Sequence, residues 1–355
     1  MFLAWNEIKK NKLRFTLIIG VLMLVSYLVF FLSGLANGLE NMNRESVDKW
    51  KATSIVLTDE SDKSMSQSSM TLADVDDVDA KDIAVIGQIN AIAGNGEEKK
   101  NVSIFGIHKD EFIMPTVTEG KAFSEANEVI AGDSLKEEGF KLGDELHLSS
   151  TEEVLTIVGF TDNARFNAAP VLYGDLSTFQ RVKFGEAADL NKESINGIVV
   201  RTGDATAITQ NDSLEAIEIE TFIRNLPGYT EQNLTLNLMI YFLFGISAVI
   251  VAIFLYVLTV QKISMFGVMK AQGISNRYLS RSVIAQTFIL AAIGVAVGFG
   301  LALLTGAFLP SAVPVAFDLV TMLIYGLVLV IVAIAGAVFS VLTIVRIDPL
   351  KAIGG

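Results

Sequence analysis

The sequence predicts an integral membrane protein made of four transmembrane helices, with an extracellular α+β domain inserted after the first helix. Four uncharged apolar stretches each exceed the roughly 20 residues that a helix needs to cross a bilayer, and 51% of the 355 residues are hydrophobic. The Lys and Arg residues outside the insert lie in short segments beside these stretches. The long insert at 40–233 is acidic instead, with 17 Lys and Arg against 36 Asp and Glu.

The predicted transmembrane helices follow directly from the uncharged stretches. The third stretch runs on to Phe317, too long for one span, but Pro310 and Pro314 end its helix early because proline lacks the backbone N–H. A short external loop at 310–318 then precedes the last helix. The four helices are expected at 15–39, 234–261, 282–309 and 319–345.

The first stretch could instead be a signal peptide, with a basic front (Lys9 to Arg14) and small residues at Gly34 and Ala36. Its apolar part is longer than the core of a typical signal peptide, and three more spans follow. We therefore expect a retained membrane anchor.

The charges predict the orientation. The N-terminal segment 1–14, the loop 262–281 and the tail 346–355 together contain ten Lys and Arg and two acidic residues. Loops rich in Lys and Arg stay in the cytoplasm, so both termini are expected inside and residues 40–233 outside. The chain has no cysteine, so an exported domain of this size must rely on its own core. This fits a bacterial cell surface, and we expect a Gram-positive one.

The external domain has the mixed pattern of an α+β fold. The first helix is expected to continue outward from Asn41 to Lys51, with Trp50 near the membrane interface, before a Ser-rich loop at 61–69. Asp175 is a good N-cap for a following helix. Strands are expected near 83–86, 102–107, 128–132, 143–148, 154–160, 170–173 and 198–200, and helices at 134–140, 175–182 and 205–214.

No motif for catalysis is present. The chain lacks GxxxxGK[ST], so it cannot bind ATP through a P-loop; if it uses ATP, a partner brings it. His108 and His147 are 39 positions apart and no cysteine accompanies them, so surface histidines are more plausible than a metal site. The acidic cluster 74–79 lacks the glycine and glutamate of a calcium-binding EF-hand loop. We predict no catalytic residue, no metal site and no nucleic-acid partner.

The segment between the second and third spans combines charge with apolar residues. Leu258–Arg281 has four basic residues and no acidic one. Lys262–Ala271 is expected to continue the second helix, Gly273 to end it in the left-handed conformation, and Ser275 to cap the next helix. Charge alone would fit an ordinary cytoplasmic loop. The rigid corner and the apolar centre favour a docking surface for a cytoplasmic protein.

This segment, "QKISMFGVMKAQGISNRYL", resembles the coupling loop of FtsX/MacB-type (type VII) ABC transporter permeases, through Gly267–Ala271 and Gly273. "AWNEIKKNKLRFTL", "RIDPLKAIGG" and "GDELHLSSTEEVLTIVGFTDNARFNAAPVLY" resemble other parts of the same family, so the resemblance covers nearly the whole chain. "FLSGLANGL" and "FLYVLTVQKIS" are most similar to its heme-efflux and DevC-like subfamily. Other members move peptides, lipoproteins or antibiotics, or transmit force to cell-wall hydrolases.

The resemblance implies a homodimer in the membrane lipid, driven by two copies of a cytoplasmic ABC ATPase that binds ATP and Mg²⁺. The loop would transmit ATPase closure to the spans, and substrate would be pushed out from the outer leaflet by mechanotransmission. Phe266, Met269 and Ile274 would be apolar plugs in the ATPase, and Lys270 and Arg277 polar rim contacts. The implied coupling residues are Lys262, Phe266, Met269, Lys270, Gly273, Ile274 and Arg277.

The cargo implied by the subfamily is heme, with no cofactor of the protein's own. Met, Tyr or Glu could ligate iron, and Arg44 could pair with a propionate. The alternative to heme contact is that the Met and Phe side chains make packing or lipid contacts and that Glu45 is solvated. Export of a peptide, antibiotic or lipid, and activation of an external enzyme without transport, remain open. The candidate heme-contacting residues are Phe31, Leu35, Met42, Arg44, Glu45, Phe166, Met239, Tyr241 and Phe242.

Overall fold

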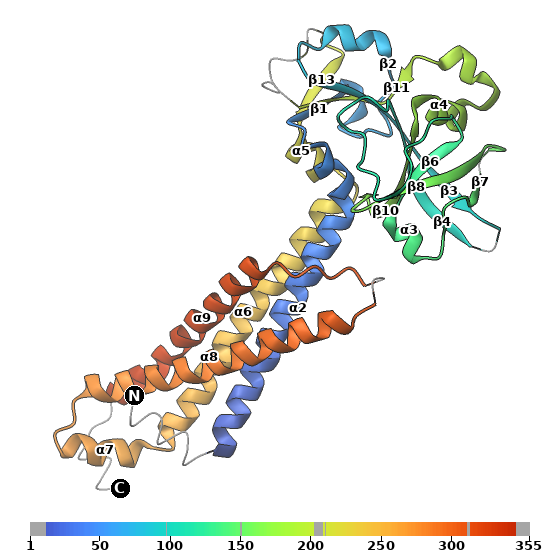
Figure 1. Cartoon of the computed structure of the whole chain (residues 1–355). Coiled ribbons are helices and arrows are strands. Elements are labelled where there is room, and N and C mark those ends of the chain that lie inside the picture. The colour runs from blue at the N-terminus through green and yellow to red at the C-terminus, as the bar shows by residue number, and fades with distance from the viewer. Residues whose placement is uncertain are drawn as a thin grey trace. The chain divides into compact units, whose positions relative to one another are not determined.

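The computed structural model describes residues 12–345, except 97, 150, 202–208, 210 and 311–312. The chain divides into two compact units, which we treat separately (Figure 1). The helical unit comprises 1–38 and 233–355, and the α+β unit comprises 39–232. The division falls within the two helices α2 (Lys12–Trp50) and α6 (Tyr229–Val260).

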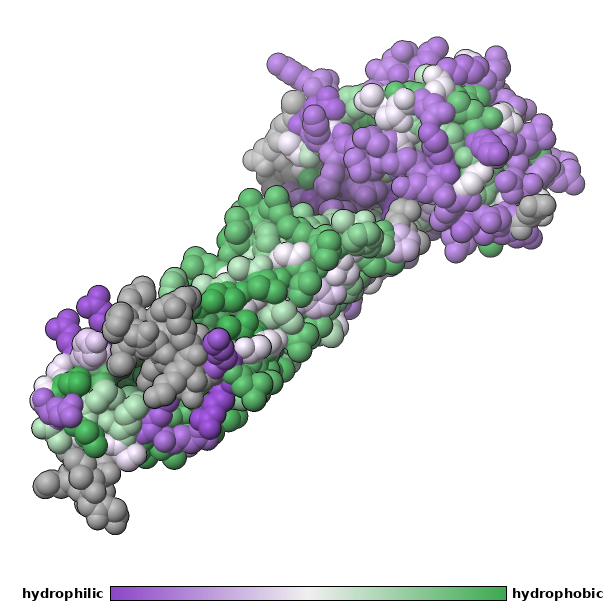
Figure 2. All heavy atoms as spheres, turned by 60° about the horizontal axis from the view of Figure 1, so that its bottom comes forward, coloured by the Kyte–Doolittle hydropathy of each residue, from purple (hydrophilic) through white to green (hydrophobic). Residues whose placement is uncertain are grey.

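Four helices of the described chain are long and apolar enough to cross a membrane, as the sequence predicts. They are α2, α6, α8 (Asn276–Phe308) and α9 (Leu319–Val345), and the short helix α7 (Ile263–Ala271) lies between α6 and α8 in the chain. The surface of the helical unit is mostly apolar along the spans, with polar residues at one end, whereas that of the α+β unit is mostly polar (Figure 2). Large side chains such as Leu323 and Phe339, each 65% exposed, suit contact with lipid.

Glycines allow the membrane helices to pack closely. A Cβ at Gly298 of α8 would overlap the Ser26 Oγ of α2, and one at Gly336 of α9 would lie 2.6 Å from the Ala248 carbonyl oxygen of α6. Small residues at helix contacts are the usual means of membrane helix association, because lipid provides no hydrophobic drive between helices.

The α+β unit is built on an eleven-stranded mixed sheet and a separate two-stranded sheet. The main path runs β13-β1-β12-β3-β4-β10-β6-β8-β5, with β7 and β9 attached beside it. The strands are β1 Ser54–Thr58, β2 Met70–Thr71, β3 Ile83–Gly94, β4 Lys99–Ile107, β5 Glu119–Gly120, β6 Glu128–Gly132, β7 Glu145–Leu148, β8 Val154–Thr161, β9 Arg165–Phe166, β10 Ala169–Asp175, β11 Ser194–Ile195, β12 Gly197–Val200 and β13 Leu214–Glu218.

The described part of this unit also has three short α-helices, α3 (Asp133–Glu137), α4 (Leu176–Phe184) and α5 (Ile219–Arg224). Its 3-10 helices are Asp59–Ser61, Leu72–Asp77 and Gly185–Asn191. Asp175 caps α4 as predicted, because its Oδ1 accepts a hydrogen bond of 3.0 Å from the Ser177 N–H. Phe179 of α4 packs so closely on the sheet that only glycine fits beneath it, at Gly87 and Gly106.

Two expectations for this unit are wrong. Trp50 is 1% exposed and packs in the core beside Phe105, with ring centroids 6.0 Å apart, instead of lying at a membrane interface. Leu214, the end of the helix expected at 205–214, begins strand β13, which pairs with β1. Thr209 pairs with Val78 in an isolated bridge, and residues 211–213 are not helical either. Residues 205–208 and 210 lie outside the described residues.

Candidate functional site

The segment between α6 and α8 forms a rigid corner. Gly273 has a φ of +88°, and a Cβ placed there would meet no atom within 4 Å beyond the neighbouring residues, so backbone conformation is what favours glycine here. The N–H of Ile274 donates to the Met269 carbonyl at 3.1 Å, which closes the end of α7. Ser275 caps α8, with its Oγ accepting from the Tyr278 N–H at 3.3 Å. The predicted corner and cap are confirmed.

Helix α7 is separate from α6, which corrects the prediction of one continuous helix. Helix α6 ends at Val260, and Lys262 has non-helical dihedral angles before α7 begins. Packing explains the break: Phe266 is 4% exposed and lies in a core with Leu279 and Val283 of α8 and with α9. No proline or glycine marks this break in the sequence, so the residues alone did not indicate it.

Lys270 fixes the corner to α9. Its Nζ donates to the carbonyl oxygens of Ile344 at 2.7 Å and Val345 at 3.2 Å, at the described end of that helix. A cation here also meets the negative end of the helix dipole. Desolvation lowers the pKa of Lys270. Movement of α7 therefore has to move or break contacts with both α8 and α9.

The exposed face of α7 differs from the predicted plugs. Phe266 faces inward, and Met269 and Ile274 pack partly against the same core. Met265 and Val268 are the exposed apolar residues, at 40% and 44%. Sequence reasoning missed these two residues, although their spacing of three places both on one helix face.

Beyond α7, Tyr278 is 54% exposed and Arg277 is exposed. Lys262 lies above the ring of Phe15, with its Nζ 5.9 Å from the centroid. The predicted coupling residues thus divide into an inward set that braces the corner and an outward set that a partner could touch. Among the described residues proposed for partner contact, Arg277 is the exposed one.

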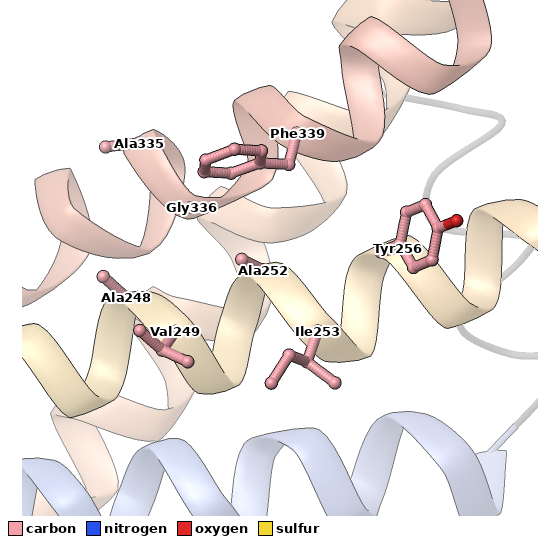
Figure 3. Close-up of a pocket in the computed structure, with 8 residues that line it drawn as sticks. All are labelled: Ala248, Val249, Ala252, Ile253, Tyr256, Ala335, Gly336 and Phe339. Carbon is pink, nitrogen blue, oxygen red and sulfur yellow. The ribbon is translucent and has the colours of Figure 1, made fainter.

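An apolar groove of about 530 Å³ lies between α6 and α9 (Figure 3). The two helices approach closely at Gly336, and the larger side chains of Ile253, Tyr256 and Phe339 line the groove beside this contact. Val249, Ile253 and Tyr256 are about half exposed along it. Sequence reasoning missed this groove, although small residues at Ala248 and Ala252, four apart, signal close helix packing. It is lined by Ala248, Val249, Ala252, Ile253, Tyr256, Ala335, Gly336 and Phe339.

Five of the predicted heme residues belong to the helical unit. Met239, Tyr241 and Phe242 are exposed on α6, at 46%, 63% and 65%. Phe31 is half-buried and stacks on Tyr27 of the same helix, with ring centroids 6.1 Å apart. Leu35 is also half-buried. The three α6 residues are therefore available to lipid, a second protein or an apolar substrate.

The other four heme candidates belong to the α+β unit. Arg44 is engaged in an ion-pair network: its Nη2 donates to Glu220 at 2.7 Å and its Nε to Asp48 at 2.9 Å. Tyr229 extends the network by donating to Glu40 at 2.8 Å. Arg44 could therefore pair with a propionate only by giving up these partners.

Phe166 lies in the core of the α+β unit, 7% exposed, with its ring centroid 5.2 Å from that of Phe105. Met42 and Glu45 are half-buried on α2. The hairpin between β9 and β10 reaches this helix. The Asn167 N–H donates to the Asn43 carbonyl at 3.1 Å, and the Ala168 N–H donates to the Met42 carbonyl at 3.1 Å. Met42 thus supports the hairpin through its backbone.

Two family models match the chain. The MacB-like periplasmic core domain matches residues 15–214, and the FtsX-like permease C-terminal model matches residues 237–349. The chain belongs to the MacB/FtsX-like permease family. It is thus a membrane permease with an extracytoplasmic domain, and the resemblance seen in its sequence is confirmed.

Curated relatives of this permease span its whole length. Two staphylococcal proteins that carry the name hemin transport system permease protein HrtB are 29% identical (Staphylococcus epidermidis RP62A, over 363 residues) and 25% identical (Staphylococcus haemolyticus, over 358 residues). Both alignments cover 100% of this chain and 99% of the relative. An uncharacterized ABC transporter permease of Mycobacterium tuberculosis H37Rv is 22% identical with the same coverage.

A solved structure is also similar to part of the chain. The extracellular domain of the noncanonic ABC-type transporter YknZ from Gram-positive bacteria covers 47% of this permease and 100% of its own chain, at 13% identity. Its TM-score of 0.32 is too low to establish a common fold.

Proposed function

We propose that this permease is the membrane subunit of a homodimeric ABC efflux transporter that exports heme, driven by a separate cytoplasmic ATPase. The observation that carries the proposal is the full-length similarity to staphylococcal proteins named as hemin transport permeases. The ATPase would supply ATP and Mg²⁺, since this chain has no P-loop motif.

The corner at α7 and α8 supports the coupling part of the proposal. It presents Met265, Val268 and Tyr278 outward while Phe266 and Lys270 hold it to α8 and α9. Apolar side chains on a braced helix suit insertion into a groove, because little conformational entropy is lost on binding. In this proposal Met265 and Val268 enter the ATPase, and Arg277 contacts the rim.

The exposed part of α6 supports an apolar cargo. Heme is a large planar molecule with apolar faces, and Met239, Tyr241 and Phe242 offer it thioether, phenol and aromatic contacts. Each could also contact a second copy of the permease. The cargo and the dimer contact are therefore proposed together for this surface of α6.

Hemin tolerance tests the cargo. A strain that lacks the gene should become sensitive to hemin, and the plasmid-borne wild-type gene should restore its tolerance. The triple variant Met239→Ala, Tyr241→Ala, Phe242→Ala should fail to restore it, whereas Leu304→Ala, an exposed lipid-facing change on α8, should succeed. Unchanged hemin tolerance after deletion would overturn the heme assignment.

ATPase coupling is tested separately. Met265→Asp and Val268→Asp should each abolish co-purification of the partner ATPase, because a carboxylate would be buried in an apolar groove. Asn276→Asp puts the same charge at the exposed start of α8 and should leave the complex intact. If both α7 variants retain the ATPase, another surface makes the contact, and the proposed role of α7 is wrong.

A further inference from the structure

A row of amide side chains lies on one face of strands β3 and β4 in the α+β unit. Gln88 and Asn90 are two apart on β3, and Asn90 is directly opposite Ser103 of β4. Asn101 of β4 is opposite Ile92. Residues directly opposite in an antiparallel pair share a face, so these five side chains point the same way.

Gln88 is buried but only partly satisfied. It is 3% exposed, and its Nε2 donates to Asn90 Oδ1 at 2.8 Å and to Ser103 Oγ at 3.0 Å. Its Oε1 is buried and accepts no hydrogen bond from the described residues. The backbone N–H of Gln88 donates to Asn196 Oδ1 at 2.7 Å, which holds the residue in place. A buried acceptor without a partner is unfavourable, and a donor from a bound molecule would satisfy this one.

Two adjacent hollows open over this row. One has a volume of about 470 Å³ and the other about 60 Å³, and both are lined by Asn90, Phe166 and Asn167. Gln88 lines the smaller one. The stacked rings of Phe166 and Phe222, with centroids 6.5 Å apart, form an apolar wall there. A ligand in the larger hollow could thus extend one group to Gln88.

The lining of these hollows is almost uncharged. Lys63 is the single charged residue among the described lining residues, and its Nζ lies 3.8 Å from Glu215. The side chains of Asn101 and Asn167, and the Nδ2 of Asn90, make no hydrogen bond to a described residue. The groove therefore offers unpaired amide donors and acceptors beside an apolar wall.

We propose that this groove binds an extended, uncharged peptide segment of a partner outside the membrane. Side chains two apart on a strand repeat about every 6.8 Å, the same interval at which alternate peptide groups repeat in an extended chain. A peptide lying along β3 would place its N–H and C=O groups opposite the amides of Gln88 and Asn90. Phe166 would take an apolar side chain of that peptide.

The chemistry of the groove excludes two simpler ligands. A fully apolar ligand would leave the Gln88 Oε1 without a donor and would cover the Asn90 Nδ2, at a cost of about 1–3 kcal/mol for each group. A small anion would find no unpaired cation among the described lining residues, since Lys63 lies beside Glu215. Peptide binding in this groove is independent of the identity of the exported cargo.

The test uses the full-length permease in nanodiscs and a phage-displayed library of random heptapeptides. Selected peptides are synthesised with a fluorescent label, and binding is measured by anisotropy. Asn90→Ala and Asn101→Ala should each weaken binding about tenfold, which corresponds to one lost hydrogen bond of about 1.4 kcal/mol. Asn95→Ala, in the exposed β3–β4 turn, should change binding less than about twofold.

Both test residues are exposed, so folding should be retained, and tryptophan fluorescence during thermal unfolding checks it. A library from which no binder is enriched would overturn the proposal, as would peptides that bind both variants as well as the wild type. Displacement of the peptide by chitotriose, with direct chitotriose binding lost in Asn90→Ala, would identify a saccharide site and overturn the peptide class.

Discussion

At the scale of single residues, Gly273 sets the shape of the corner between α6 and α8. Gly273→Ala should destabilise the folded corner by about 1–2 kcal/mol, because an L-residue is strained at a φ of +88°. We expect lower substrate-stimulated ATP turnover in the complex, measured by phosphate release. Gly245→Ala is the matched control: it also has open space around a Cβ, but lies in regular helix, and should leave turnover unchanged. Equal turnover in both variants would contradict the role of the corner.

Arg44 is the second residue whose effect can be predicted. Arg44→Lys should lower the free energy of unfolding by about 1–3 kcal/mol, because one ammonium cannot replace a guanidinium that contacts Asp48 and Glu220 together. Thermal unfolding followed by tryptophan fluorescence measures this loss. Arg224→Lys, on the exposed end of α5, should have no effect. A similar loss in both would show that the network contributes nothing specific.

These residues show what local chemistry can predict. Gly273, Ser275 and Asp175 have roles that depend on their own backbone and nearest neighbours, and all three were predictable. Phe266 and Trp50 were not, because an apolar side chain does not show whether it faces lipid, a partner or its own core. Of the candidate sites, the sequence could indicate the segment at α7 but not its outward face, nor the groove over Gln88, which depends on strand pairing.

At the scale of elements, α2 and α8 depend on one close contact. Gly298→Val should prevent their packing, because its Cβ would overlap Ser26. We expect loss of monodisperse protein in size-exclusion chromatography after detergent extraction. Gly300→Val, two residues along α8, meets nothing within 4 Å of a Cβ and should extract as the wild type does. If Gly298→Val elutes as monodisperse protein, the close contact between α2 and α8 is not needed for stable packing.

The segment before β6 depends on a carboxylate. Hydrogen bonds from Lys121 and Ser124 lower the pKa of Glu128 from its ordinary 4.5 to about 2. A lowered pKa in the folded state stabilises the fold above pH 4.5, and this contribution disappears as the pH falls from 4.5 towards 2. Glu128→Gln should therefore lower the Tm at pH 7 and have little effect near pH 2. A pH-independent difference in Tm would contradict this explanation.

At the scale of the whole molecule, the distribution of charge predicts the topology. The chain has no cysteine, so single cysteines can be introduced without background. Glu152→Cys should react with a membrane-impermeant maleimide on intact cells, whereas Gln272→Cys should react only after lysis, because basic loops stay inside. Both positions are exposed, so burial does not distinguish them. Labelling of Gln272→Cys on intact cells would overturn the orientation.

The hairpin tip at Asn167 and Ala168 has a consequence for motion of the α+β unit. Its two N–H groups are bound to consecutive carbonyls of α2, at Met42 and Asn43. Successive carbonyls of a helix are about 100° and 1.5 Å apart. A small sliding or turning of α2 against the sheet would therefore break both bonds at once, and the next matching pair of carbonyls lies a full residue step away. Such a step would also draw Trp50 of the same helix out of the core, so the hairpin and the core together should hold α2 in one register against the sheet.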